Sequence, residues 1–310
     1  VCKNCWLVQT EDYANAEELF DDEYAYFSST SSSWLNHASN YCEIITQKLK
    51  LSKDSFVVEL ASNDGYLLKN FVKLGVPCLG IEPTKKTAQV SRDLGVEVKE
   101  VFFSKNVALQ LVSEGRKADL IIGNNVYAHV PDINDFTEGV AVLLKSNGVV
   151  TFEFPHLMEL INKIQFDTIY HEHFSYLSLI SIKSIFSKFG LKIFDVDQLG
   201  THGGSLRVYG CLQHANHKIS NNVEKILNDE IEAGLMNKDI YENFQIKANK
   251  IKDTFVQFLL NAKYDKKVVA GYGAAAKGNT LMNYAGIKRD MISFVCDAAV
   301  SKIGKYLPGS

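Results

Sequence analysis

The chain has 310 residues and a formal net charge of −3; 46% of its residues are hydrophobic and 22% are charged. This composition is ordinary for a soluble globular protein, and the length suits two domains. The charge balance disfavours nucleic-acid binding as the main function, since a broad basic surface would be expected, and no apolar run is long enough for a membrane span.

The cysteine residues and the two ends of the chain are relevant to the cellular compartment of the protein. Six cysteines are present, and four of them stand in apolar or mixed stretches typical of buried free thiols. This usage fits a reducing compartment and predicts a cytoplasmic protein. The chain begins at Val1 and not at methionine, and it stops at KYLPGS. We therefore expect both ends to be cut from a longer chain, so the lack of a visible signal segment carries little weight.

Strand and helix patterns alternate from residue 56 onward. An acidic and serine-rich segment leads into a helix, and FVVEL is then a buried strand by its β-branched content. This strand is followed by a helix ending in glycine, the strand VPCLGIEPT and a helix near 85–94. The alternation continues with the segments VEVKEVFF and ADLIIGNNVYAHV, a helix around 135–145 and the segment GVVTFEFP. Alternating elements with short turns predict a doubly wound parallel sheet. FDVDQLGTHGGSLRVYGCL predicts an antiparallel pair of strands that closes it.

The rest of the chain predicts a second, smaller α/β domain. Residues 216–263 are polar, lysine-rich and helical in pattern, which is typical of a linker helix pair. KKVVAGYGAAAKGNTLMNYAG begins another strand-turn-helix unit, and MISFVCD is a further strand. We expect an N-terminal module over 1–36, a core over 37–215 and a truncated C-terminal domain over 216–310.

The turn after the first strand of the core indicates a cofactor. In VVELASNDGYLL, Glu59 ends the strand, and the turn contains Asn63, Asp64 and Gly65. Ligands of such sheets bind at the carboxyl ends of the strands. The second strand ends with Glu82, whose carboxylate can accept hydrogen bonds from both ribose hydroxyls. We therefore expect a ribose-containing ligand at this edge.

The acidic character of the turn discriminates between such ligands. A dinucleotide loop reads G-x-G-x-x-G, which is absent, and Glu59 and Asp64 would repel a pyrophosphate, so a nicotinamide oxidoreductase is disfavoured. S-adenosylmethionine, with its ammonium and sulfonium groups, fits better. E-x-A-x-N-D-G resembles the first motif of class I methyltransferases, with Ala61 where glycine is usual. ADLIIGNNVYAHV resembles their fourth-strand motif, with Asn124 or Asn125 beside the methyl donor. The expected cofactor-binding residues are Glu59, Asn63, Gly65, Glu82 and Asn124.

A cluster of ionisable groups stands in YHEHFSYLS, at residues 170–178. Two histidines flank a glutamate, which allows three interpretations: part of a metal site, an acid/base cluster, or a polar piece of core. The metalloprotease pattern H-E-x-x-H is absent. The residues alone leave all three interpretations open.

Seven segments, in order, resemble one family: the nucleotide-sugar C-methyltransferases, typified by the dTDP-sugar 3-C-methyltransferases. The segments, which span nearly the whole chain, are VCKNCWLVQ, YAYFSSTSSSW, VELASNDGYLL, NNVYAHVPD, YHEHFSYLS, THGGSLRVY and GYGAAAKGNT. The resemblance implies an N-terminal zinc-binding module, a class I, Rossmann-like methyltransferase core and a C-terminal domain. It also implies an enzyme that uses S-adenosylmethionine to methylate the carbon next to the keto group of a nucleotide-linked 4-keto-6-deoxy sugar, with dTDP as the expected nucleotide.

The resemblance assigns roles to the ionisable cluster. Tyr170, Glu172 and His173 occupy the family's Y-x-E-H active-site motif, and His129 and Tyr24 match two further active-site positions. Methylation next to a ketone needs a base for the C3 proton, donors for the enolate oxygen and an in-line methyl group. We expect His173 to be the base because imidazole titrates near working pH, while Glu172 orients it or is itself the base. Tyr170 would donate to the enolate, and His129 and Tyr24 would position or polarise the substrate.

The segment CKNC is half of a tetrahedral zinc site, since two thiolates leave two positions empty. The resemblance implies that the other two ligands come from an upstream C-x-x-C, which this sequence lacks because it starts at Val1. We expect Cys2 and Cys5 to ligate a structural zinc ion in the intact protein and the site to be incomplete here. The alternative is two surface thiols on a turn.

Two glycine-rich segments are candidates for substrate binding. GYGAAAKGNT follows a strand and opens a helix, so its N–H groups and Lys277 suit a diphosphate; a tight turn of small residues is an equal alternative. It is not a P-loop, because glycine follows Lys277 and does not precede it. THGGSLRVY offers His202 and Arg207 to the substrate.

Two rival functions differ in what they predict. An O- or N-methyltransferase acting on another small molecule would show no exchange of a C3 proton with solvent. A non-catalytic nucleotide-sugar binding module would bind its ligand without turnover.

Overall fold

The computed structural model describes residues 1–11, 27–299 and 302–309, which form two compact units. Unit 1 consists of Val1–His156 and Glu172–Ile231, and unit 2 of Leu157–His171 and Glu232–Ser310. This division differs from the boundary expected at residue 216. Helix α9 (Asn221–Glu232) buries Val223 and Ile226 in the core of unit 1, so most of this helix packs with that unit, and the expected domain boundary stays a prediction.

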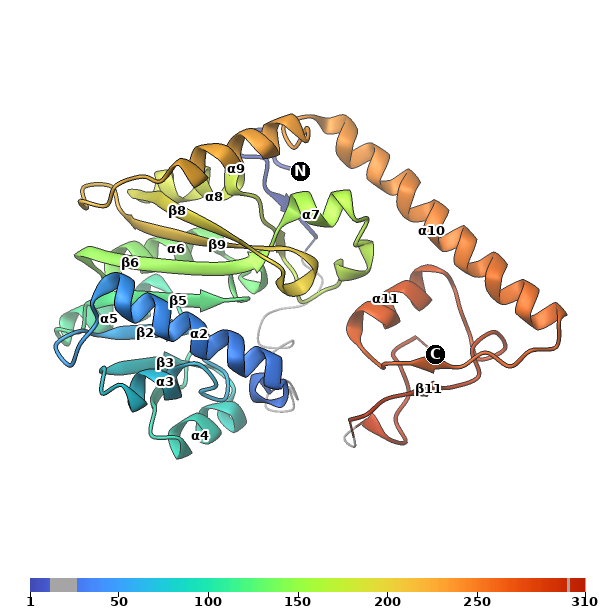
Figure 1. The fold of residues 1–310 in the computed structure, drawn as a ribbon, viewed down its shortest axis with the longest axis horizontal. Helices are drawn as coiled ribbons and strands as arrows, with labels where there is room; N and C mark the ends of the chain where they lie inside the picture. Colours follow the sequence, from blue (N-terminus) through green and yellow to red (C-terminus); the bar gives the residue numbers. More distant parts are fainter. Residues whose placement is uncertain (12–26, 300–301, 310) are drawn as a thin grey trace. The chain divides into compact units, whose positions relative to one another are not determined.

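A mixed sheet forms the centre of unit 1 (Figure 1). Its strands are β2 (Val57–Leu60), β3 (Cys78–Ile81), β4 (Glu97–Lys99), β5 (Ala118–Asn124), β6 (Leu144–Pro155), β8 (Leu191–Leu199) and β9 (Ser205–Leu212). Their order is β4-β3-β2-β5-β6-β9-β8. The strands from β4 to β6 are parallel, while β9 lies antiparallel to both β6 and β8. The expected parallel sheet with an antiparallel closing pair is confirmed.

Helices cover both faces of this sheet, and each face has its own apolar core. The helices of unit 1 before α9 are α2 (Ser32–Leu49), α3 (Leu68–Lys73), α4 (Lys85–Asp93), α5 (Lys105–Ser113), α6 (Ile133–Leu143) and α8 (Leu179–Lys188). Helices α5, α6, α8 and α9 pack on one face, and α2 and α3 on the other. All four residues of β2 are buried, as expected for a strand covered on both sides. This double coverage is the reason why the parallel strands appear in the sequence as apolar runs.

The carboxyl ends of the parallel strands share one edge of the sheet. Strands β2, β3, β5 and β6 end at Leu60, Ile81, Asn124 and Pro155. Because these strands run in the same direction, the segments that follow them emerge at this edge, where ligands of such sheets bind. The short 3₁₀ helices η2 (Tyr127–His129) and η4 (Thr201–Gly203) also lie in segments that follow or join strands there.

The N-terminal segment is tied into unit 1 by a small antiparallel sheet. Strand β1 (Val8–Gln9) pairs with β7 (Ser175–Tyr176), in the register Val8 to Tyr176 and Gln9 to Ser175. The next short element, the 3₁₀ helix η1 (Ser28–Thr30), leads into α2. Residues 172–174, which carry the predicted base, directly precede β7.

Unit 2 is smaller and mainly helical. It contains α7 (Leu157–Asn162), η3 (Phe166–Thr168), α10 (Lys238–Tyr264), β10 (Gly271–Tyr272), α11 (Ala276–Tyr284) and β11 (Val295–Cys296). Strands β10 and β11 pair in parallel, as expected for a strand-turn-helix unit followed by a strand. Cys296 is exposed, contrary to the expectation of a buried thiol, because β11 has only β10 as a partner within the described residues. No helix among the described residues is both long and apolar enough to cross a membrane.

A buried ion pair fixes α9 against the sheet and against α8. The carboxylate of Glu230 accepts a hydrogen bond from Nε2 of His156 at 2.7 Å. It also accepts the backbone N–H groups of Leu179 and Ile180, at 2.6 and 2.8 Å, which begin α8. Glu230 thus caps one helix from another, in the position where a helix dipole favours a negative charge.

We predict that Glu230→Ala lowers the free energy of unfolding by about 3 kcal/mol, because it leaves a buried histidine and two N–H groups without their acceptor. For a unit of this size that corresponds to a fall in Tm of roughly 8 °C. Thermal unfolding followed by circular dichroism measures it. The exposed Glu224 on the same helix gives the control, since Glu224→Ala should change Tm by no more than about 2 °C. Equal effects of the two substitutions would contradict the structural role of Glu230.

Candidate active site

The turn after β2 has a backbone conformation that favours glycine. Ala61, Asn63 and Gly65 have φ angles of 53°, 50° and 75°, in the left-handed region. A Cβ on Gly65 would also lie 2.6 Å from Oγ of Ser91, so packing and backbone both require glycine there. Ala61 adopts the same region at a cost of roughly 1 kcal/mol, which explains how alanine can stand where glycine is usual.

Three buried carboxyl groups surround this turn: Glu59, Asp64 and Glu82. Burial raises the pKa of Glu59 well above its usual range, and the negative charges of Glu82 and Asp64 raise it further. Within the described part of the chain, one oxygen of Glu59 and one of Asp64 have no hydrogen-bond partner. A cation bound here would relieve this repulsion, so the turn fits the ammonium and sulfonium groups of S-adenosylmethionine and disfavours a pyrophosphate.

Glu82, at the end of β3, holds the turn in place. Its Oε2 accepts the N–H of Asn63 at 2.9 Å, and its Oε1 accepts the N–H of Thr84 at 3.0 Å and the hydroxyl of Thr87 at 3.1 Å. A carboxylate offers about four acceptor positions, so Glu82 can bind these groups and still accept from a ribose hydroxyl. The residue therefore fits the role predicted for it and also has a structural one.

Asn124 ends β5 and is aligned with this acidic group. Glu59 is paired in register with Ile122, and since side chains alternate along a strand, Asn124 points to the same face of the sheet. Both polar atoms of its side-chain amide are buried and without a partner among the described residues. An unpaired buried amide costs about 1–3 kcal/mol, which a ligand with polar groups at this edge would recover.

His129 and His173, two of the predicted active-site residues, lie against each other. Their ring centroids are 4.7 Å apart with an edge-to-face angle of 62°. Nδ1 of His129 lies 2.7 Å from the carbonyl oxygen of Glu172, and because a carbonyl can only accept, Nδ1 carries the proton. Burial and, to a smaller extent, the neighbouring His173 together lower the pKa of His129 to about 3. His129 is therefore a neutral imidazole near pH 7, with Nε2 as its acceptor nitrogen.

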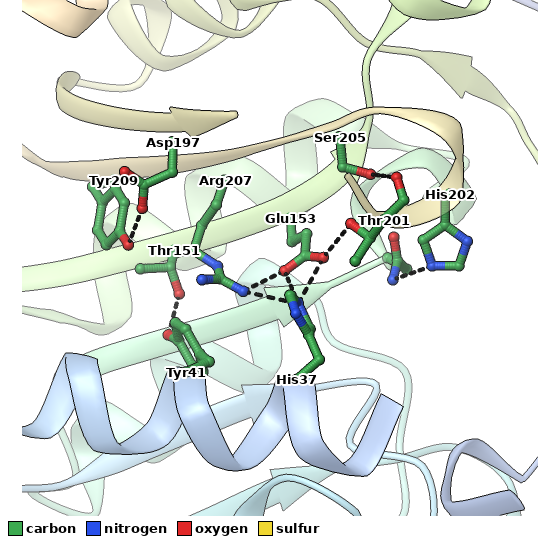
Figure 2. Close-up of polar contacts among 11 residues, drawn as sticks. His37, Tyr41, Thr151, Glu153, Asp197, Thr201, His202, Ser205, Arg207 and Tyr209 are labelled. Atoms are coloured by element: carbon green, nitrogen blue, oxygen red, sulfur yellow. Dashed lines mark hydrogen bonds and ion pairs between the residues drawn. The ribbon is translucent and has the colours of Figure 1, made fainter. Parts of the chain in front are cut away.

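A buried ionic cluster centred on Glu153 lies on the face of the sheet covered by α2 (Figure 2). Nε2 of His37 lies 3.0 and 2.9 Å from the two oxygens of Glu153, the hydroxyl of Thr201 donates at 3.0 Å, and Arg207 forms an ion pair. Burial opposes ionisation of Glu153, but the hydrogen bond from His37 and the charge of Arg207 outweigh it and lower the pKa. Glu153 is thus an anion held by α2, β9 and the β8–β9 loop.

The same cluster connects the β8–β9 loop to the end of β5. Thr201 is followed by His202, whose Nε2 accepts a hydrogen bond from Nδ2 of Asn125 at 3.2 Å. Figure 2 labels His202 and marks this hydrogen bond with a dashed line. The N–H of Asn125 in turn donates to the carbonyl oxygen of Glu153 at 2.7 Å. Asn125 has a left-handed φ of 54°, so the chain reverses directly after Asn124. The loop and the turn after β5 therefore depend on one another.

Trp34 adds an aromatic contact to this arrangement. Its ring stacks on His37, with centroids 4.9 Å apart, and meets His202 edge-on at 5.4 Å. It also stacks on Tyr66, the residue after Gly65, at 6.1 Å. Trp34 thus links α2 to both the cofactor turn and the β8–β9 loop.

The other predicted site residues lie outside the described residues or in different units. Tyr24 lies outside the described residues. Tyr170 and Lys277 belong to unit 2, whereas Glu172 and His173 belong to unit 1. In unit 2 the loop before Lys277 has a neighbouring carboxylate, since the N–H of Ala274 donates to Asp297 at 2.7 Å. One N–H group of the proposed diphosphate-binding loop therefore already donates to a carboxylate of the protein.

Arg207 differs from its expected role of facing the substrate. Only 5% of the residue is exposed, and its guanidinium is paired with Glu153. The reason is the sheet register, which puts Arg207 directly opposite Glu153 on the adjacent strand. His202, by contrast, is exposed at the edge where the cofactor turn lies.

The segment CKNC forms a compact turn in which the pKa of one thiol is lowered. Trp6 has a φ of 59°, and the N–H of Cys2 donates to the carbonyl oxygen of Leu7 at 2.8 Å. Hydrogen bonds from the N–H groups of Cys5 and Asn4 lower the pKa of Cys2, while burial raises that of Cys5. Two thiols on such a turn fit half of a zinc site. Across the described ranges, no group of three or more His, Cys, Asp or Glu side chains could hold a metal.

Sequence reasoning missed the central part of the ionic cluster. His37 stands on the polar face of a helix and gave no specific signal. Glu153 did leave one: it is a single acidic residue within the apolar strand VVTFEFP, near the carboxyl end where functional groups gather. A buried charge at such a position requires a partner, but the sequence does not show which one.

A cavity of about 520 Å³ lies away from this edge. Its lining includes Asp119, near the start of β5, and Asn147, in the early part of β6. The Lys48 ammonium in this lining is paired with Asp195 at 2.7 Å. The cavity therefore lies near the amino ends of the strands, opposite the edge that carries the predicted site.

Comparison with known proteins places the chain among methyltransferases. Residues 34–196 match a methyltransferase domain, and residues 200–310 match a C-methyltransferase C-terminal domain. Over all 310 residues the chain is 34% identical to the C-methyltransferase NovU of Streptomyces niveus, covering 74% of that protein. A ubiquinone biosynthesis O-methyltransferase of Bartonella quintana is 26% identical over 100 residues, which are 30% of this chain and 38% of that protein.

Solved structures of low identity are also similar. A S-adenosylmethionine-dependent methyltransferase from Clostridium acetobutylicum has a TM-score of 0.45 and 13% identity, over 57% of this chain and 92% of that one. The PH0226 protein from Pyrococcus horikoshii has a TM-score of 0.48 and 15% identity, over 60% and 94%.

The sheet order, the turn after β2 and the matched domain define an enzyme of the class I methyltransferases, which use S-adenosylmethionine. Within that class, the full-length identity to NovU and the matched C-terminal domain show that the chain belongs to the C-methyltransferase family.

The low pKa of His129 predicts a specific dependence of stability on pH. Above about pH 6.5, His129 is neutral in both the folded and the unfolded states. As the pH falls from 6.5 toward 3, the unfolded state takes up a proton that the folded state does not, so stability is lost. We expect His129→Asn to make the curve of unfolding free energy against pH less steep in this window, by about 1 kcal/mol per pH unit.

Urea unfolding between pH 4.5 and 7.5 measures this slope. His214→Asn, at an exposed position, is the control and should leave the curve parallel to that of the wild type. A curve for His129→Asn that is also parallel to the wild type would show that His129 binds protons equally in both states.

Proposed function

We propose that this C-methyltransferase methylates the carbon next to the keto group of a nucleotide-linked 4-keto-6-deoxy sugar, with a dTDP-sugar as the expected substrate. The observation that carries the proposal is the contact between His129 and His173 at the sheet edge where the acidic cofactor turn lies. The seven family segments support the sugar substrate. A histidine base could also serve an O-methyltransferase, by taking the proton of a hydroxyl group, so proton exchange at C3 is the property that separates the two functions.

S-adenosylmethionine supplies the methyl group when it is bound. In our proposal Glu59 and Asp64 offset the positive charge of the cofactor, Glu82 binds its ribose, and Asn124 lies beside the methyl donor. The support is electrostatic: the pKa of Glu59 is raised by burial and by its acidic neighbours, and unpartnered oxygens remain on two of these carboxyl groups. Asn63 and Gly65 complete the turn.

His173 is proposed to take the proton from C3, leaving the electron pair of the C–H bond on the enolate. Its neighbour His129 supports this assignment. Once His173 is protonated, a second imidazolium 4.7 Å away would repel it, but the pKa of His129 is lowered to about 3, so His129 stays neutral. The same low pKa makes His129 itself a poor base at neutral pH. Nε2 of His129 can instead accept a hydrogen bond from the substrate.

The remaining members of the motif are proposed to act around this proton transfer. The carboxylate of Glu172 would stabilise the imidazolium on His173 or, in the alternative assignment, take the proton itself. Tyr170 would donate to the enolate oxygen, where a positioned donor typically contributes about 3 kcal/mol to the transition state. Tyr24 would position the substrate together with His129. Lys277 is proposed to bind the diphosphate of the substrate, and His202 is proposed as a separate substrate contact.

Cys2 and Cys5 are proposed to hold a structural zinc ion together with two ligands from outside the described residues. The N–H groups that lower the pKa of Cys2 favour the thiolate form that zinc binds. The ion would stabilise the turn and take no part in the methyl transfer.

Proton exchange tests the proposed function directly. The protein is incubated in heavy water with a dTDP-4-keto-6-deoxy sugar and no S-adenosylmethionine, and deuterium entry at C3 is followed by mass spectrometry. We expect exchange in the wild type and a loss of roughly 10²–10⁴-fold in His173→Asn. His171→Asn is the matched control, because His171 is at the variable position of the motif and should leave the rate within about threefold of the wild type.

The outcomes separate the hypotheses. Exchange at the wild-type rate in His173→Asn, combined with its loss in Glu172→Gln, would move the base to Glu172. A wild type that binds the sugar nucleotide without any exchange would contradict the sugar C-methylation proposal as a whole.

The raised pKa of Glu59 predicts proton release when the cofactor binds. A raised pKa means that the acid keeps its proton to higher pH than an ordinary glutamate, and a cation beside it lowers that pKa, so binding of S-adenosylmethionine should release protons. Calorimetry in phosphate and in Tris buffer measures the number of protons released. We expect Glu59→Gln to abolish the release and to weaken binding by about tenfold.

Glu114→Gln, at an exposed helix end, is the control and should release protons as the wild type does. Equal proton release in the wild type and in Glu59→Gln would show that Glu59 does not contact the cation.

A further inference from the structure

The segment that carries His173 has no regular secondary structure of its own. Residues 172–174 directly precede β7 in the sequence and belong to no helix or strand themselves. The direction of the His173 side chain therefore depends on how the backbone on either side of it is held. Catalytic groups must be positioned to within about 0.5 Å, so the groups that hold this backbone have functional weight.

One side of the segment is held by the turn after β5. The carbonyl oxygen of Glu172 accepts the proton on Nδ1 of His129 at 2.7 Å. The N–H of Phe174 donates to the carbonyl oxygen of Ala128 at 2.9 Å. These two bonds fix the residues before and after His173, but neither of them binds His173 itself.

On the other side, Thr10 of the N-terminal segment binds this backbone. The hydroxyl of Thr10 donates to the carbonyl oxygen of His173 at 2.9 Å, across 163 positions of sequence. The backbone N–H of Thr10 donates to the carbonyl oxygen of Phe174 at 3.2 Å. Thr10 thus binds two consecutive carbonyl groups and is the residue that fixes the peptide group of His173 from this side.

The N-terminal segment is well enough anchored to act as a brace. Thr10 directly follows β1, which pairs with β7 two residues beyond His173. Leu7 is 6% exposed and packs in the core of unit 1, and Cys5 packs against the same core. The turn formed by Cys2 to Leu7 is closed by its own hydrogen bonds. A displacement of this turn would therefore be transmitted through β1 to Thr10.

We propose that Thr10 is a positioning residue for His173, through which the N-terminal cysteine turn sets the orientation of the catalytic imidazole. The proposal rests on the proposed function in that it takes His173 as the base. The hydroxyl group makes no contact with the reacting atoms; it acts by holding the peptide group to which the base is attached.

Thr10→Val tests this role, because valine keeps the branched shape of threonine and removes the O–H donor, while the backbone bond to Phe174 remains. We expect C3 exchange and kcat to fall by about tenfold, a loss of the size that a small misplacement of a base produces. KM for the sugar nucleotide and Kd for S-adenosylhomocysteine should stay within about twofold of the wild type. Thr10→Ser, which keeps the donor, should restore the rate to within about threefold.

Thr254→Val is the matched control. The hydroxyl of Thr254 bonds to the carbonyl of Lys250 in its own helix in unit 2, so its loss should change none of these quantities. Wild-type exchange rates in Thr10→Val would overturn the proposal. A parallel loss of rate, ligand binding and Tm would also overturn it, since that pattern describes general destabilisation and not positioning.

Histidine NMR separates this proposal from the function on which it rests. With ¹³C-labelled histidine, the signal of His173 is assigned by its absence in His173→Asn and titrated in the wild type and in Thr10→Val. A changed titration or tautomer signal in Thr10→Val supports positioning even if the wild type shows no C3 exchange, an outcome that would reject the proposed substrate alone. An unchanged His173 signal overturns the positioning role whatever the activity.

Discussion

The buried charge of Glu153 is the constraint on which the catalytic edge depends. A carboxylate removed from water is costly unless it is paired, and a pair whose partner is removed typically loses 3–5 kcal/mol. Here the groups that pair with Glu153 come from three separate elements: His37 on α2, Arg207 on β9 and Thr201 on the β8–β9 loop. Each of these elements is therefore attached to the Glu153 carboxylate. The backbone of the same residue receives the N–H of Asn125, so the turn after β5 is tied to that residue as well.

The carboxyl edge of the sheet contains two regions of different electrostatic character. Around the β2 turn, three buried carboxyl groups repel one another, which favours a cationic ligand. After β5, burial and proximity keep His129 neutral beside His173, which leaves room for one positive charge on the pair. In our proposal, a methyl donor that carries a positive charge and a base that acquires one would bind and act at neighbouring strand ends.

Much of the core was predictable because burial on both faces makes each parallel strand an apolar run and because the turns contain glycine. The candidate residues of the turn after β2 and of the Y-x-E-H motif could be named from the sequence because they are close together in it; their roles stay predictions. The ionic cluster was not predictable, because His37 and Glu153 are 116 positions apart, and His37 and Arg207 are 170 apart. Arg207 was expected at the substrate as part of THGGSLRVY, and its pairing with Glu153 follows from the strand register, which the sequence does not show.

The same limit applies to the N-terminal segment, and it explains why its function could be misjudged. From CKNC alone, the segment is half of a metal site, and its importance would end with the stability of a small module. The register of β1 on β7 gives it a second role, because a turn that is rigid for one reason can hold a neighbouring group for another. Thr10 has no ionisable group and belongs to no motif, so the role that we propose for it follows from the two carbonyl groups that it binds. Residues of this kind become visible only when every hydrogen bond of an irregular catalytic segment is traced to its donor.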